Sequence, residues 1–103
     1  MRDGYLDRLP PRVQARIRVD DEGGCDLWAG GMSGRTNGGG VGTVDGVYGF
    51  VHRAVWRSAH GPIRADVIIV RVCRNRRCVR LEHLQATTPS RWLRHLLRGE
   101  PLT

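Results

Sequence analysis

The fold is decided by a short arginine-rich stretch, RVCRNRRCVRLEH, at residues 71–83. In it, Cys73 and Cys78 are separated by four residues, and His83 follows Cys78 after another four. A third cysteine, Cys25, lies nearly fifty residues upstream. Three thiolates and one imidazole satisfy the tetrahedral coordination that zinc prefers. The spacing therefore predicts a zinc site that ties the region of Cys25 to the basic loop.

Other uses of these cysteines fit the chain less well. An odd number leaves one cysteine unpaired in any disulfide framework. The first ten residues contain no apolar core segment, so they do not resemble a secretory signal, and we expect the protein to work inside a cell. The remaining alternative is that the cysteines are free and buried and that the histidine lies on the surface.

Length and composition indicate one small domain over residues 1–103. The chain has 103 residues and 40% hydrophobic content, which leaves room for a single core. Its longest aliphatic run, residues 67–70, is far shorter than the roughly 20 residues that span a bilayer. We therefore expect no membrane partner.

The charge is strongly basic and unevenly distributed. The net charge is +7, and all 17 basic residues are arginines. Residues 49–103 hold 11 arginines against 3 acidic residues. Arginine can form two hydrogen bonds at once to a phosphate or to the edge of a guanine, so this composition favours a nucleic-acid partner. A GC-rich coding sequence is the alternative explanation for the absence of lysine. Five arginines lie in or beside the loop between the two cysteines, and together they should attract a polyanion. The alternative interpretation is that they form an ordinary solvated face. These arginines are Arg71, Arg74, Arg76, Arg77 and Arg80.

The remaining patterns predict an α+β fold. Residues 9–17 favour a short helix opened by proline, and residues 26–28, 41–44 and 47–51 favour strands. The pair Asp45-Gly46 predicts a tight hairpin turn between the last two strands. Helices are predicted over 51–59 and from Thr88-Pro89 through residue 98, with a buried strand at 67–70.

Several short motifs occur in an order that resembles the HNH (ββα-metal, or His-Me finger) endonucleases of the phage type, which are related to the His-Cys box homing endonucleases. The resemblance covers residues 10–95 and implies a small zinc-stapled ββα-metal fold with a glycine-rich antiparallel ribbon and flanking helices. In the family, the residues that match Cys25, Cys73, Cys78 and His83 bind structural zinc. The motifs are Gly24-Cys25-x-x-Trp28-x-Gly30, His52-Arg53, His60-Gly61-Pro62-Ile63, Cys73-Arg74-Asn75-Arg76-Arg77-Cys78-Val79, His83-Leu84 and Thr88-Pro89.

Two positions depart from the family pattern. Where the family has a histidine that acts as general base, this chain has Arg71, and where it has an asparagine or histidine that holds magnesium, this chain has Trp92. A guanidinium stays protonated and an indole offers no lone pair to a metal, so both catalytic groups are missing. His95 and His60 are the fallback candidates for catalysis.

Three functions follow from these observations. The leading prediction is an inactive HNH-like regulator of phage type that binds double-stranded DNA. The ribbon of residues 38–51 would enter the major groove, and Arg35, Arg53 and the loop arginines would contact DNA. The alternatives are a divergent nuclease that uses magnesium, and a zinc-stapled module that binds an acidic protein. Because homing-type relatives act as dimers, the resemblance also implies that the protein could form a homodimer.

Overall fold

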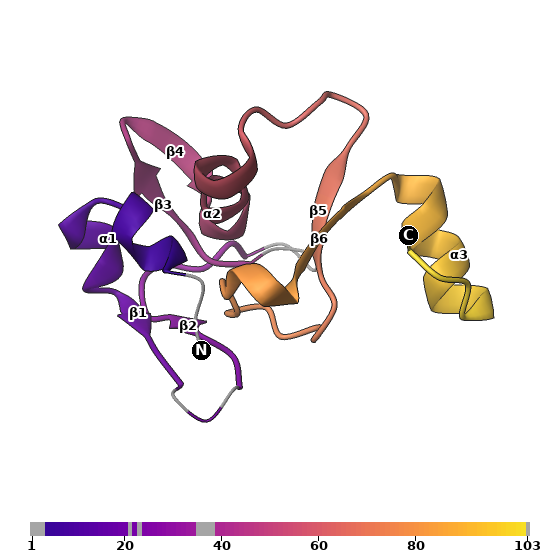
Figure 1. The fold of residues 1–103 in the computed structure, drawn as a ribbon, viewed down its shortest axis with the longest axis horizontal. Coiled ribbons are helices and arrows are strands. Elements are labelled where there is room, and N and C mark those ends of the chain that lie inside the picture. Colours follow the sequence, from indigo (N-terminus) through magenta and orange to yellow (C-terminus); the bar gives the residue numbers. More distant parts are fainter. Residues whose placement is uncertain (1–3, 21, 23, 35–38, 103) are drawn as a thin grey trace.

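The computed structural model describes residues 4–20, 22, 24–34 and 39–102. Over these residues the fold is α+β, with three antiparallel strand pairs among short helices, as the sequence predicts (Figure 1). The pairs are β1 with β2, β3 with β4, and β5 with β6. In chain order the elements are η1 (Tyr5–Arg8), α1 (Pro11–Gln14), β1 (Ile17–Arg18), β2 (Leu27–Trp28), β3 (Val41–Val44), β4 (Val47–Phe50), α2 (Val51–His60), β5 (Ile68–Arg71), η2 (Leu81–His83), β6 (Leu84–Thr87) and α3 (Pro89–Arg98).

The glycine-rich ribbon is the hairpin β3–β4, and its turn is the predicted one. Asp45 and Gly46 have φ of 52° and 81°, the left-handed pair that a type I′ turn requires. Val44 pairs with Val47 across the turn. The ribbon spans residues 41–50 within the predicted 38–51, and residue 38 lies outside the described residues.

Helix α2 follows β4 directly and supplies the centre of the core. Val51 and Val55 are fully buried and Ala54 is 6% exposed, so these three residues form the side of the helix that faces the core. Hydrophobic side chains from η1, α1 and β1 pack into the same core, including Tyr5, Leu9, Val13 and Ile17. The predicted helix over 9–17 is shorter than expected, because α1 ends at Gln14 and Ile17 begins a strand that pairs with Trp28.

The packing of Trp28 requires glycine at positions 30 and 40, next to the β3–β4 ribbon. Its side chain is 3% exposed, and its indole nitrogen donates to the Gly31 carbonyl at 3.0 Å. A Cβ at Gly30 or Gly40 would overlap this indole. The glycines thus let the backbone lie directly against the ring.

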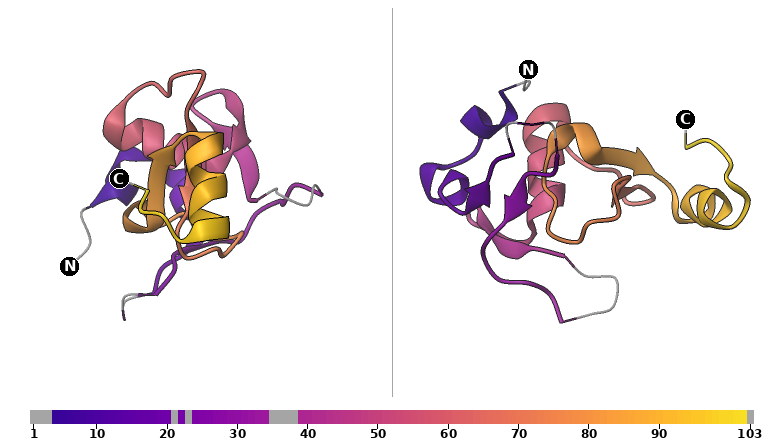
Figure 2. Two further views of the ribbon diagram at one scale, coloured as in Figure 1. Left: turned by 90° about the vertical axis from the view of Figure 1, so that its right-hand side faces the viewer. Right: turned by 90° about the horizontal axis from the view of Figure 1, so that it is seen from below.

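The C-terminal elements form a hairpin followed by a helix that projects from the body. Strand β6, which the sequence analysis did not predict, pairs with β5 from Ile68–Thr87 to Arg71–Leu84. Helix α3 has the predicted bounds, because the Thr88 side chain accepts from the Arg91 N–H and Gly99 ends it at φ 69°. Figures 1 and 2 show α3 at the opposite end of the molecule from η1 and α1.

The apolar side of α3 is left largely open. Leu93, Leu96 and Leu97 are 55%, 42% and 74% exposed. At ten residues each, α2 and α3 are the longest helices in the described part of the chain, and neither could cross a membrane.

Candidate metal centre and basic cleft

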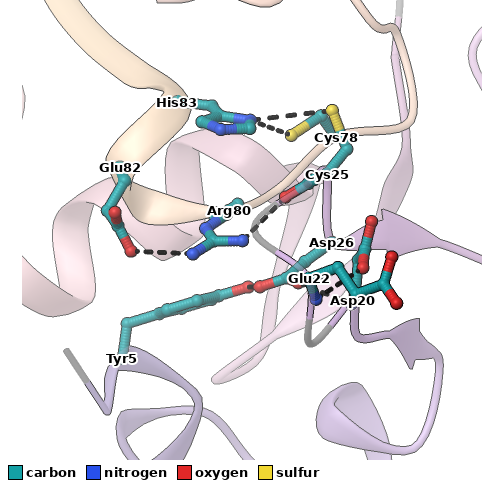
Figure 3. Close-up of polar contacts among 10 residues, drawn as sticks. Tyr5, Asp20, Glu22, Cys25, Asp26, Cys78, Arg80, Glu82 and His83 are labelled. Carbon is teal, nitrogen blue, oxygen red and sulfur yellow. Dashed lines mark hydrogen bonds and ion pairs between the residues drawn. The ribbon is translucent and has the colours of Figure 1, made fainter. Parts of the chain in front are cut away.

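The four predicted metal ligands meet at one point between β2, the basic loop and η2. The ligand atoms of Cys25, Cys73, Cys78 and His83 all lie within 4.8 Å of one another. The Nδ1 atom of His83 lies 3.4 Å from the sulfur of Cys78 and 3.6 Å from that of Cys25 (Figure 3). The structure therefore brings together two segments that are 58 positions apart along the chain.

The geometry and chemistry of this group fit a metal of the size and preference of zinc. In a tetrahedral zinc site, neighbouring sulfur and nitrogen ligands lie roughly 3.6 Å apart. Burial raises the pKa of the Cys78 thiol well above its ordinary value, and burial also raises the pKa of Cys25. Adjacent thiolates in such surroundings need a cation, so the donor set matches a structural metal site.

The backbone of the loop holds its cysteines against β2. The Cys78 N–H donates to the Asn75 carbonyl at 3.0 Å, and Arg74 adopts a left-handed φ of 60° that turns the chain. The Val79 N–H then donates to the Asp26 carbonyl at 2.8 Å. These bonds place Cys78 beside the strand that follows Cys25.

Two buried polar groups brace the same region. The Tyr5 hydroxyl donates to the fully buried Asp26 carboxylate at 2.6 Å (Figure 3). Arg80 is 8% exposed, and its guanidinium donates to the Gly24 carbonyl at 2.7 Å and to Glu82 at 3.2 Å. Arg80 was predicted as a DNA contact, but its burial and partners make it a support for the metal loop.

A cleft of about 640 Å³ opens between α2, strand β5 with the loop that follows it, and α3. Arg71 and Trp92, which stand at the two departures from the family pattern, both line it. The walls also include His52 and Arg53 from α2 and Arg74 from the loop. The cleft lining thus combines cationic side chains with aromatic and aliphatic ones.

Arg71 and His52 form a fixed pair in this cleft. Arg71 donates from Nη1 to His52 Nδ1 at 2.9 Å, and His52 Nε2 lies 3.1 Å from the Ile69 carbonyl. Because a guanidinium only donates, Nδ1 must accept and Nε2 must carry the proton. Burial first, and the Arg71 charge second, lower the pKa of His52 to about 3. Both ring nitrogens are therefore engaged, and the imidazole is a weak base.

The two histidines considered for catalysis do not line the cleft. His95 stacks on Trp92 with ring centroids 5.4 Å apart, and the His60 ring lies tilted against Trp56 with centroids 4.1 Å apart. Among the described residues that line the cleft, His52 contributes an imidazole, and His60 and His95 do not.

The remaining candidate DNA contacts fall into three groups. Arg53 and Arg74 line the cleft, as does Arg76, which donates to the Ser33 carbonyl at 3.1 Å. Arg77 is exposed and donates to the Trp28 carbonyl at 3.1 Å. Arg35 lies outside the described residues.

Comparison with known proteins agrees with the landmarks in the sequence. A family model described as HNH endonuclease matches residues 49–93, which include three of the four candidate ligands and the cleft residues Arg71 and Trp92. Residues 49–93, which we call the HNH segment, are therefore similar to HNH endonucleases. Cys25, the fourth residue of the candidate metal group, lies outside the HNH segment.

The chain is also similar to a phage protein. It is 31% identical over 65 residues to "Protein 7.7" of Escherichia phage T7, an alignment that covers 63% of this chain and 48% of the relative. The chain thus spans about half the length of that relative. No solved structure matches it. The predicted resemblance to phage-type HNH nucleases is confirmed over the HNH segment.

Two parts of this site could not be predicted from the sequence. The bond between His52 and Arg71 was not predicted, although the His52-Arg53 motif marked the position. The Tyr5–Asp26 bond was also missed, since nothing in the sequence links a tyrosine near residue 1 to an aspartate beside Cys25.

Proposed function

We propose that this protein binds double-stranded DNA through an HNH-type fold that has lost its cleavage chemistry. The observation that carries the proposal is the Arg71–His52 pair in the cleft. The family places its general base at the position of Arg71, where this chain has a permanent cation. The one cleft imidazole among the described residues is held neutral with both nitrogens engaged.

The second half of the chemistry is replaced as well. Trp92 stands where the family holds magnesium, and an indole has no lone pair for that ion. A cation such as Arg71 is suited instead to binding a phosphate that remains intact. Magnesium enters this proposal only if the protein proves to be an active nuclease.

We assign zinc to the four-ligand centre, with a structural role. All four positions of a tetrahedral site are supplied by Cys25, Cys73, Cys78 and His83, which leaves none open for a reacting water. The metal would hold the arginine loop at the mouth of the cleft.

Binding to DNA would use the arginines around the cleft and the hairpin β3–β4. Arg71, Arg74 and Arg76 would hold phosphates, while the ribbon enters the major groove. A regulatory role in a phage-related setting is consistent with the phage relative. A homodimer would double the number of phosphates within reach of so small a protein.

The test pairs a supercoiled-plasmid nicking assay with a gel-shift on the same DNA, in magnesium, in manganese and in a chelator of these ions. We expect a salt-sensitive shift and intact plasmid. Arg76→Gln removes one exposed cleft cation, and it should reduce the slope of log affinity against log salt by about 0.9. Arg64→Gln is the matched control, since Arg64 is 80% exposed, pairs only locally with Asp66 and does not line the cleft.

Two outcomes would overturn the proposal. Metal-dependent nicking would establish the alternative of a divergent nuclease, and His95→Gln and His60→Gln would then identify the base. Weak binding to DNA that does not respond to Arg76→Gln would favour the third function, a module that binds an acidic protein.

A further inference from the structure

The cleft contains aromatic and aliphatic side chains that a contact to the DNA backbone does not require. Beside its arginines, its walls include the aromatic or aliphatic side chains of Phe50, Ile68, Trp92 and Leu96. A duplex presents phosphates and sugars along its backbone and keeps the faces of its bases stacked inside, so it offers no base face to an aromatic side chain in the cleft. Its volume of about 640 Å³ is within the range of sites for small organic groups, about 300 to 1,000 Å³.

Trp92 is held in a fixed orientation at this wall. The His95 ring stacks on the indole at an interplanar angle of 17°, and His95 Nδ1 lies 2.7 Å from the Glu100 carbonyl. Because Trp92 lines the cleft and His95 does not, the imidazole supports the indole from outside the cleft. The ring is thus positioned in advance, which lowers the entropic cost of stacking a ligand on it.

Cations line the same cleft as this aromatic residue. Arg71 donates to His52 at 2.9 Å, and Arg53 and Arg74 are also among the lining residues. An aromatic platform joined to arginines is the combination by which proteins bind unpaired nucleotides, with the base on the ring and the phosphate on the cations.

We propose that the cleft takes one unpaired nucleotide of a DNA strand, with its base stacked on Trp92 and its phosphate held by Arg71. This inference rests on the proposed DNA binding and names the form of DNA that the same cleft selects. Bases inside an intact duplex are already stacked, so they reach Trp92 only after unpairing, which costs a few kcal/mol. DNA with a ready-made unpaired nucleotide avoids that cost, and we expect it to be the preferred ligand.

The experiment compares two duplexes that differ by one unpaired nucleotide, with 2-aminopurine at the unpaired position for fluorescence. Wild-type protein should bind the bulged duplex at least about fivefold more tightly than the intact one, and binding should quench the fluorescence as the base stacks. Trp92→Phe, which keeps an aromatic ring, should retain the preference. Trp92→Leu, which keeps apolar volume without a ring, should lose both the preference and the quenching.

Leu97→Ala is the matched control on the same helix. Leu97 is 74% exposed and does not line the cleft, so this variant should keep the preference for the bulged duplex. Circular dichroism establishes that each variant is folded. Equal affinity of the wild type for both duplexes would overturn this inference and leave DNA binding intact, as would a folded Trp92→Leu that keeps the preference. Failure to bind either duplex would overturn the proposed function itself.

Discussion

The buried pair of His52 and Arg71 should make the protein sensitive to acid through a single imidazole. The pKa of His52 falls from an ordinary value of 6.5 to about 3 in the folded state. Between these two values the unfolded chain binds a proton at His52 and the folded chain does not, so the free energy of unfolding decreases as pH falls from 6.5 towards 3. At pH 5.0 the pH lies about 1.5 units below the ordinary pKa of 6.5, so the free energy of unfolding should be roughly 2 kcal/mol lower than at neutral pH.

The assay is urea denaturation of the wild type and of His52→Gln at pH 7.5 and pH 5.0. A glutamine can accept from Arg71 and donate to the Ile69 carbonyl, as the imidazole does, but it does not titrate in this range. The wild type should lose roughly 2 kcal/mol more than His52→Gln between the two pH values. His60→Gln, at the exposed end of the same helix, should lose as much as the wild type.

Acid would also weaken any metal bound at the candidate centre, but that effect would be common to all three proteins and cancels in the comparison. Equal losses in the wild type and in His52→Gln would refute the reasoning, because they would mean that His52 is not held neutral by its surroundings.

Three further changes probe the metal centre and the core. Cys78→Ser removes a buried ligand, so it should abolish stoichiometric zinc binding and the folded circular dichroism spectrum. Tyr5→Phe removes a 2.6 Å donor from the buried Asp26 carboxylate and should lower the free energy of unfolding by about 1.5 to 3 kcal/mol in urea. Gly40→Ala places a methyl group into the Trp28 indole and should cost about 1 to 3 kcal/mol, measured in the same way.

Each of these changes has an informative contrary result. A folded Cys78→Ser protein would show that the metal is dispensable for the fold. A Tyr5→Phe variant as stable as the wild type would mean that Asp26 is fully satisfied by its other partners. Gly49→Ala is the control for Gly40→Ala, since a Cβ at Gly49 meets no atom within 4 Å, and equal losses in both would point to strand propensity in place of overlap.

Elements with local signals were predicted well from the sequence. The turn at Asp45-Gly46 depends on two residues that tolerate positive φ, and α3 depends on a threonine cap and a terminal glycine. The four residues of the candidate metal group were predicted because their chemistry and the spacing of Cys73, Cys78 and His83 restrict the choice, and the structure brings their ligand atoms together. This grouping could be predicted without knowing the path of the chain between Cys25 and Cys73.

Features created by distant contacts were not predicted. Strand β6 has a sequence, LQAT, with weak β character, and it becomes a strand because β5 offers it a partner. Arg80 was grouped with the exposed loop arginines, since nothing local shows that it turns inward to Gly24. The bond between Arg71 and His52 likewise depends on how β5 packs beside α2.

The long span between Cys25 and His83 also constrains how the protein can be made. Synthesis proceeds from the N-terminus, so Cys25 exists in the growing chain long before its imidazole partner, 58 positions later, is added. Closing so large a loop costs entropy, which the core and the four-residue candidate metal group would offset together. The candidate metal group can therefore form only after His83 has been added to the chain.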